Sequence, residues 1–311
     1  MQGSLPAEMQ DKWAYIAKLT DYRTHIDSVQ VTDTTNFIYP LKSLTPGETY
    51  LLSLPDIGVA VPFIYEKGQE LTLMRPDFVV RGGELNAPIA DFRTRLADLN
   101  ATDSVDDRAV FALAQTFFMN HASEPIGFYA YDVCRRYVTN PLDLEPLLAS
   151  AKGPLAQMKE IQEAKTLVEN LKKVQPGNPF VEIAGEDDLG QPVKLSEYVG
   201  QGQYVLVDFW ASWCGPCRKE IQNLKKVHQA YKNKGLAIVG VSVWEEKKED
   251  HLNAVKKLEI PWPQIIAPDG TTDLYGILGI PQIILFAPDG TIVARDLYGD
   301  AIEAAVKPLF Q

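Results

Sequence analysis

The sequence predicts an α/β fold: a carboxyl-terminal mixed sheet flanked by helices, preceded by a small antiparallel β domain and a helical segment. Three patterns lead to this prediction. Short apolar runs broken by Asn, Asp, Pro and Gly fill residues 1–85. Apolar residues at helical spacing fill residues 86–175, and strand-like and helix-like stretches alternate over residues 176–311. A chain of 311 residues has room for these three parts.

The first two parts carry no cluster of side chains that suggests catalysis. Residues 65–73 predict a hairpin that turns near Lys67 and Gly68. In the second part, residues 158–174 predict an amphipathic helix that ends at the Gln-Pro-Gly-Asn-Pro stretch of residues 175–179, the best domain boundary in the chain. Cys134 falls in a helical stretch and is expected to be a small buried apolar residue, with a regulatory partnership to Cys214 as the alternative.

The third part is expected to alternate strands and helices. Each strand is a short apolar run, and each helix has apolar residues every three or four positions. The expected strands are residues 180–183, 193–195, 204–209, 236–243, 282–286 and 291–297, and the expected helices start at Cys214 and span 247–258 and 301–309.

Composition excludes several classes of partner. The chain has 30 basic and 41 acidic residues, a net charge of −11, and no basic cluster, so we expect no nucleic-acid partner. No apolar run approaches the roughly 20 residues of a membrane helix. Three cysteines are too few to staple a fold. We expect no metal, because a Cys-x-x-Cys pair supplies only two of the four ligands of a zinc site and the remaining Cys134 lies in another part of the chain. We also expect no cofactor. The His residues are expected on helix surfaces (His121, His228, His251) or in a strand (His25), and none as a ligand.

The chemistry is concentrated in residues 205–218, Val-Leu-Val-Asp-Phe-Trp-Ala-Ser-Trp-Cys-Gly-Pro-Cys-Arg. An apolar strand-like run ends in two cysteines, and a helical pattern follows. Cys214 should therefore lie at a strand-to-helix corner, where the amides of the helix N-terminus favour thiolate over thiol. Cys214 and Cys217, three residues apart, can close a disulfide and reopen it. The motif predicts redox chemistry.

Asp208 is the single acid in this apolar strand, so we expect it to be buried. Burial without a partner is costly for a carboxylate and raises its pKa toward neutrality, which suits proton exchange with Cys217. The alternative is a carboxylate satisfied by backbone amides.

From about residue 178 to residue 311 the chain resembles the TlpA/ResA-type thioredoxin-like proteins, bacterial thiol-disulfide oxidoreductases that work outside the cytoplasm. The Trp-Cys-Gly-Pro-Cys motif carries the resemblance, together with Pro-Phe-Val-Glu-Ile at 179–183, Leu-Ser-Glu-Tyr-Val-Gly at 195–200, Gly-Ile-Pro-Gln at 279–282 and Phe-Ala-Pro-Asp-Gly at 286–290. Residues 13–86 are similar to the small β domain fused in front of such proteins in Bacteroidetes, on Asp-Ser-Val-Gln-Val at 27–31 and Gly-Gly-Glu-Leu-Asn at 82–86. The resemblance implies a thioredoxin-like fold for residues 176–311.

The resemblance also implies roles for the dithiol. Cys214 would attack the client, and a buried Cys217 would resolve the mixed disulfide, while Gly215 and Pro216 permit and stiffen the tight turn. The matching acid in thioredoxins exchanges protons with the second cysteine, usually beside a lysine on the adjacent central strand. Residues 236–243 contain no lysine, so we expect the proton path from Asp208 to rely on water.

Three further residues, together with Gly215 and Pro216, are implied to bind the client. Pro281 should follow a cis peptide bond and face the cysteines, so that the backbone of Ile280 pairs with an extended substrate; the alternative is an ordinary proline at a strand start. Trp213 is expected to cover the dithiol, and Trp210 to lie in the core.

The implied function is reduction of protein disulfides in the bacterial periplasm or cell envelope. Gly-Pro is the dipeptide of reducing thioredoxins, with potentials of about −270 mV. Electrons would come from a membrane thiol donor and pass to client proteins with disulfides, in cytochrome c maturation or disulfide repair. Family members carry a secretion or lipoprotein leader, so we interpret the plain start of this chain as the result of leader removal.

Two alternatives stay open. A thiol peroxidase is suggested because residues 180–200 also resemble peroxiredoxins. That chemistry wants a Pro and a Thr or Ser just before the attacking Cys and an Arg to polarise the peroxide, whereas the residues before Cys214 are Trp-Ala-Ser-Trp. The other alternative is a binding module in which residues 1–175 hold a partner and the redox domain is incidental.

Overall fold

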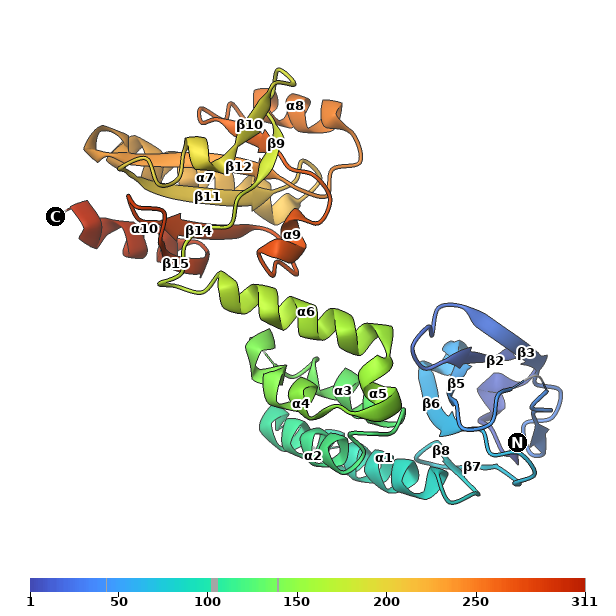
Figure 1. Ribbon diagram of the computed structural model, residues 1–311. Coiled ribbons are helices and arrows are strands. Elements are labelled where there is room, and N and C mark those ends of the chain that lie inside the picture. The colour runs from blue at the N-terminus through green and yellow to red at the C-terminus, as the bar shows by residue number, and fades with distance from the viewer. Residues whose placement is uncertain (43, 102–105, 139, 311) are drawn as a thin grey trace. The chain divides into compact units, whose positions relative to one another are not determined.

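The computed structural model describes residues 1–42, 44–101, 106–138 and 140–310, and the chain forms two compact units, Met1–Lys165 and Thr166–Gln311 (Figure 1). The division into residues 1–85, 86–175 and 176–311 stays a prediction. Within these three parts, residues 43, 102–105, 139 and 311 lie outside the described residues. The predicted fold class, α/β with antiparallel β structure at the start of the chain, is confirmed. Within the described ranges, no helix is both long enough and apolar enough to span a bilayer.

The first unit begins with two four-stranded sheets. One has the order β4-β1-β7-β8 and the other β3-β2-β5-β6, and only the β1–β7 pair is parallel. Side chains of both sheets share one apolar cluster, including Ile16 and Leu52 from one sheet and Phe37 and Leu73 from the other, so the sheets pack face to face. The strands are β1 (Gln2–Gly3), β2 (Trp13–Lys18), β3 (His25–Gln30), β4 (Phe37–Ile38), β5 (Thr49–Leu54), β6 (Val59–Ile64), β7 (Thr72–Met74) and β8 (Val79–Arg81).

The hairpin predicted over residues 65–73 is wrong. The chain does turn at Lys67 and Gly68, with Gly68 in the left-handed region at φ 82°. The arms do not pair with each other, because β6 pairs with β5 in one sheet and β7 pairs with β1 and β8 in the other. Residues 65–71 therefore form the crossing between the two sheets.

Helices complete the first unit, and Asn86 joins the first of them to the sheet. Its carboxamide oxygen accepts from the backbone N–H of Ile64 at 2.9 Å, and its Nδ2 donates to the Ile64 carbonyl at 2.8 Å. The side chain is buried and replaces a strand partner at the end of β6. The helices are α1 (Asn86–Asn100), α2 (Asp107–Asn120), α3 (Gly127–Cys134), α4 (Glu145–Ser150) and α5 (Gly153–Gln157), and α6 (Lys159–Lys173) crosses the boundary between the units.

Replacing Asn86 with alanine is expected to destabilise the protein by about 2–4 kcal/mol, because both backbone groups of Ile64 lose their buried partner. Urea unfolding monitored by circular dichroism measures the change. Asn120→Ala, at the exposed end of α2, is the matched control and is expected to stay within about 0.5 kcal/mol. Equal stability of the two variants would show that the Asn86 bridge contributes nothing.

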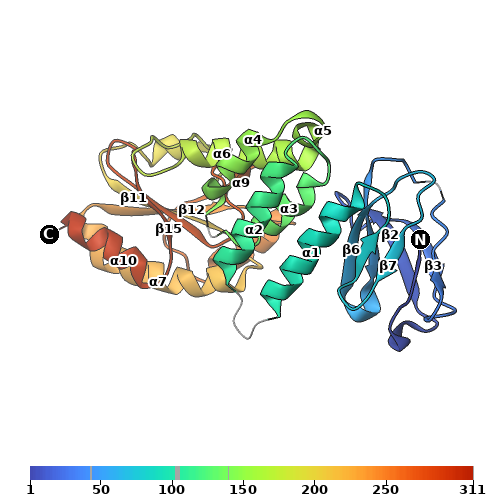
Figure 2. The ribbon, with the colours of Figure 1, turned by 90° about the horizontal axis from the view of Figure 1, so that it is seen from below.

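The second unit contains a seven-stranded mixed sheet of order β10-β9-β13-β12-β11-β14-β15 (Figures 1 and 2). The central strand β11 runs parallel to β12 and antiparallel to β14. The strands are β9 (Ala184–Glu186), β10 (Pro192–Lys194), β11 (Tyr204–Trp210), β12 (Leu236–Ser242), β13 (Gln264–Ile266), β14 (Gln282–Phe286) and β15 (Ile292–Leu297), and the helices are α7 (Gly215–Tyr231), α8 (Lys248–Lys257), α9 (Thr271–Leu274) and α10 (Asp300–Val306).

Sequence patterns located most of these elements and missed two short ones. Strand β13 and helix α9 have only three and four residues, too few for a period to be recognised. The strand expected at 180–183 is displaced, since the first strand of this sheet is β9, which begins at Ala184.

The two faces of β11 differ, and the difference positions the site. Leu206 and Trp210 belong to the apolar cluster formed with α7 and α10. Because strand side chains alternate, Asp208 shares this face and points toward α7. On the opposite face, the ring of Phe209 packs against Tyr275 at 5.1 Å.

Candidate active site

Cys214 lies at the corner between β11 and α7, as predicted. It is the N-cap residue of α7 in an extended conformation, and its Sγ accepts a hydrogen bond from the backbone N–H of Cys217 at 3.1 Å. Pro216 lies in the first turn of the helix, where no N–H is required for helical bonding. The corner directs the positive end of a 17-residue helix at Cys214.

A disulfide joins Cys214 to Cys217, with their Cα atoms 5.3 Å apart. Cys217 is completely buried, while Cys214 keeps an exposed fraction of 4%. An incoming sulfur can therefore reach Cys214 and not Cys217. Glycine is not sterically required at position 215, because a Cβ there would meet open space and the φ of Gly215 is not positive. The expectation that Gly215 is needed to permit the tight turn is therefore wrong.

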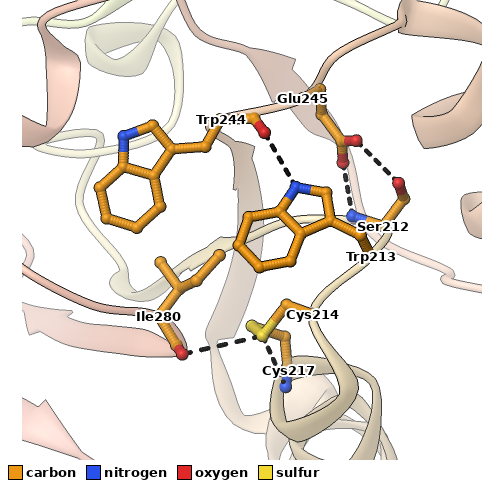
Figure 3. The surroundings of a disulfide bond; sticks show 7 residues. All are labelled: Ser212, Trp213, Cys214, Cys217, Trp244, Glu245 and Ile280. Carbon is orange, nitrogen blue, oxygen red and sulfur yellow. Dashed lines mark hydrogen bonds between the residues drawn. A yellow bond between two sulfur atoms is a disulfide. The ribbon is translucent and has the colours of Figure 1, made fainter. Parts of the chain in front are cut away.

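The loop before β14 forms the opposite wall of the dithiol (Figure 3). The Ile280–Pro281 peptide bond is cis, as the resemblance implied. The carbonyl oxygen of Ile280 lies 3.7 Å from Cys214 Sγ. A reduced Cys214 can donate its S–H to this carbonyl, and an extended peptide can reach the same edge.

Asp208 is buried beneath α7, with 1% of its surface exposed. Neither carboxylate oxygen has a hydrogen-bond partner within the described part of the chain. The alternative of a carboxylate satisfied by backbone amides is therefore wrong. Burial, and next the negative charge of Glu220, raise the pKa of Asp208 to about 8. A carboxyl group with this pKa keeps its proton to higher pH than an exposed aspartate does.

Glu220 is the residue of this site that sequence reasoning missed. It is buried on α7, one turn after Cys217, and its Oε1 accepts from the backbone N–H of Gly299 and from Asn223 Nδ2, both at 3.1 Å. Its hydrogen bonds are the reason it can stay buried where Asp208 has none. The available signal was its spacing: position 220 lies beside Ile221 on the helix face that also carries Cys217.

The two tryptophans of the motif have different environments. Trp210 is completely buried, as expected, and its indole N–H donates to Gln264 Oε1 at 3.0 Å. Trp213 is 59% exposed, its ring lies beside the disulfide, and its indole N–H donates to the carbonyl of Trp244 at 2.9 Å (Figure 3). Next to Trp244, the carboxylate of Glu245 accepts from the backbone N–H and the hydroxyl of Ser212 at 2.5 and 2.7 Å.

His251 was expected on a helix surface, and this expectation is wrong. The side chain is completely buried in α8, with its ring 5.3 Å from that of Trp210 and its Nε2 3.0 Å from Asp188 Oδ1. The Asp188 carboxylate satisfies one ring nitrogen, which makes burial of the imidazole possible. Cys134 is completely buried at the end of α3, as predicted, and burial raises its pKa to about 12.

Comparison with known proteins finds one matching family model and several similar proteins. Residues 176–295 match the model of the AhpC/TSA family. The thiol-disulfide oxidoreductase ResA of Bacillus subtilis is 30% identical over 123 residues, which are 39% of this chain and 67% of that protein. ResA of Geobacillus thermodenitrificans is 30% identical over 38% of this chain and 67% of its own length. A crystal structure of the thioredoxin domain of a thiol-disulfide oxidoreductase from Bacteroides vulgatus has 38% identity and a TM-score of 0.41, and covers 44% of this chain and 99% of that domain.

A dithiol at a helix N-terminus, a cis proline opposite it and this shared sequence have one explanation. The chain belongs to the thioredoxin-like thiol-disulfide oxidoreductases of the TlpA/ResA type.

Proposed function

We propose that this protein reduces disulfide bonds of client proteins in the bacterial periplasm or cell envelope. The observation that carries the proposal is the Cys214–Cys217 pair at the start of α7, in which only Cys214 has an exposed fraction. A client disulfide can meet one sulfur while the other stays protected. This asymmetry suits a nucleophile and a resolving thiol.

The reaction transfers two electrons in two exchanges. The Cys214 thiolate attacks a client sulfur, the client S–S bond breaks, and one client thiolate leaves. The Cys217 thiolate then attacks Cys214 Sγ, which closes the enzyme disulfide and releases the second client thiolate. The N-terminus of α7 and the Cys217 N–H stabilise the negative charge on Cys214. A thiol donor, which we expect in the membrane, returns the enzyme to the dithiol.

Asp208 supplies the proton transfer for the second exchange. Its pKa of about 8 lets it accept the proton of the Cys217 thiol and return it later. Because β12 contains no lysine, water is the carrier that we propose between them.

The dipeptide between the cysteines supports the proposed direction of electron flow. Gly215 and Pro216 are the pair found in reducing thioredoxins, so we propose a potential of about −270 mV, far from the strong oxidants at about −120 mV. Clients with accessible disulfides in cytochrome c maturation or disulfide repair fit such a reductant. For residues 1–175 we propose a role in docking a partner.

The AhpC/TSA match keeps thiol peroxidase as a second candidate. The two functions differ in a direct assay. A reductase accelerates the reduction of insulin disulfides by dithiothreitol and leaves peroxide unchanged. Peroxide consumption without dithiol exchange would replace the reductase proposal.

Trapping with Cys217→Ser tests the proposal on natural clients. Without the resolving thiol, the mixed disulfide on Cys214 should accumulate and be released by dithiothreitol. Diagonal electrophoresis of envelope extracts reads it out, and the double variant Cys214→Ser/Cys217→Ser is the matched control. If the single variant captures no more than the double variant, Cys214 does not attack protein disulfides.

A further inference from the structure

Trp244 has a conformation and an exposure that the core of the protein does not require. It follows β12, with φ at 55°, in the left-handed region that a bulky aromatic residue rarely occupies. Its side chain is 42% exposed. A residue held in a costly conformation with an exposed ring points to a function in binding.

The turn that carries Trp244 is tied to the residues just before Cys214. The Trp244 carbonyl accepts from the Trp213 indole N–H, and the Glu245 carboxylate accepts from both the N–H and the hydroxyl of Ser212. Ser242 Oγ adds a longer bond to the same carboxylate at 3.4 Å. These bonds use the backbone of Trp244 and the side chain of Glu245, and leave the ring of Trp244 available.

The Trp244 ring lies near Trp213 and Ile280, two residues that are expected to bind the client. Figure 3 shows the Trp213 indole next to the disulfide, with the Trp244 indole and the Ile280 side chain on the same side of it. Leu278, two residues before Ile280 in the loop that leads into β14, is 68% exposed. Trp213, Trp244 and Leu278 thus present much of their apolar surface to solvent, while Ile280 is partly buried against the core.

We propose that Trp244 is a specificity-determining residue, which with Trp213 and Ile280 holds an apolar, preferably aromatic, side chain next to the client cysteine under attack. The proposal rests on the reductase function above and names the class of client. When a client sulfur lies in line with Cys214, each residue next to the client cysteine is only about 3.5 Å of chain farther away. Those side chains meet the two indoles, and offset or edge-to-face packing then adds to area burial.

Two model substrates test this, the symmetrical disulfides of the peptides Gly-Phe-Cys-Phe-Gly and Gly-Ser-Cys-Ser-Gly. The full chain is reduced, freed of reductant and mixed with excess peptide disulfide. Acid quenching and chromatography then follow the released peptide thiol in a single turnover, because the substitutions themselves alter tryptophan fluorescence. The measured quantity is the ratio of the second-order rate constants for the Phe and Ser peptides.

We expect the unsubstituted protein to prefer the Phe peptide by about tenfold or more. Trp244→Ala should reduce the ratio to about one by slowing the Phe peptide alone, since it removes the ring and keeps the carbonyl that binds Trp213. Trp244→Phe should restore most of the preference. Leu189→Ala, an 84% exposed apolar residue in the turn between β9 and β10, is the control and should change nothing.

Two results would overturn the proposal. An unchanged ratio in Trp244→Ala shows that the ring does not contact the client, and an equal slowing of both peptides shows a structural role. Failure of the unsubstituted, fully reduced protein to reduce either peptide has a different signature and removes the reductase function together with this inference.

Discussion

Replacement of Cys214 with serine is expected to lower the rate of disulfide reduction by about 1000-fold or more. Serine keeps the N-cap geometry, because its hydroxyl can accept the Cys217 N–H as the sulfur does. It is not a nucleophile toward disulfides, so Cys217 is left buried and out of reach of the client.

The insulin reduction assay measures this loss, and Cys134→Ser is the matched control. Cys134 is fully buried and its pKa is raised to about 12, so its thiol should take no part and the rate should stay within about twofold. If Cys214→Ser kept as much activity as Cys134→Ser, the electrons would have to pass through another group. The roles proposed for the dithiol would then be wrong.

Asp208→Asn is expected to change how stability depends on pH. In the folded protein burial and Glu220 raise the pKa of Asp208 to about 8, from an ordinary value of 3.8. Between these values the folded state keeps a proton that the unfolded state has released. The unfolded state therefore binds fewer protons, and the free energy of unfolding falls as pH rises through this window. The favourable contribution is complete below pH of about 4 and is lost by pH of about 8.

Asparagine has nearly the same shape and does not titrate, so the variant lacks this loss. Relative to the unsubstituted protein, the oxidised Asn variant should gain about 4 kcal/mol between pH 5 and pH 8.5. Urea unfolding of both oxidised proteins at a series of pH values measures the difference. Parallel pH profiles would show that Asp208 is charged in the folded protein.

The same substitution should slow catalysis by about 100-fold at pH 7 if Asp208 accepts the Cys217 proton. The slow step should be the release of client from the mixed disulfide and not its formation. Quenched-flow analysis of the peptide reaction separates the two steps. A variant that is stabilised at high pH yet resolves at the normal rate would leave Asp208 without a catalytic role.

Local patterns were sufficient where a short stretch carries the whole signal. The run from β11 into α7 combines an apolar strand, a helix-capping position and a proline in the first turn, so Cys214 could be placed at the corner before any contact was known. Asp208 could be placed in the core because each of its sequence neighbours is apolar. The cis bond before Pro281 came from the family resemblance, since local residue types alone favour trans.

Errors arose where a partner distant in sequence decides the environment. His251 has charged neighbours in α8 and was assigned to the surface, yet Asp188, 63 positions earlier, pairs with its ring and allows burial. The residues around Gly68 are typical of a hairpin turn, but the strands on either side, β6 and β7, pair with other strands in two different sheets. Secondary structure was local in both cases, while burial and pairing were not.

The sequence by itself therefore determined the reactive pair, the buried acid and the fold class, because strand period, helix capping and cysteine spacing are properties of neighbouring residues. Only the tertiary structure decided what surrounds the pair. Glu220 beside Asp208, the Ile280 carbonyl opposite Cys214 and the Trp244 carbonyl that binds the Trp213 indole come from segments that meet through the packing of β11, β12, β14 and α7. Contacts of that kind depend on which faces are buried together, and no local pattern records them.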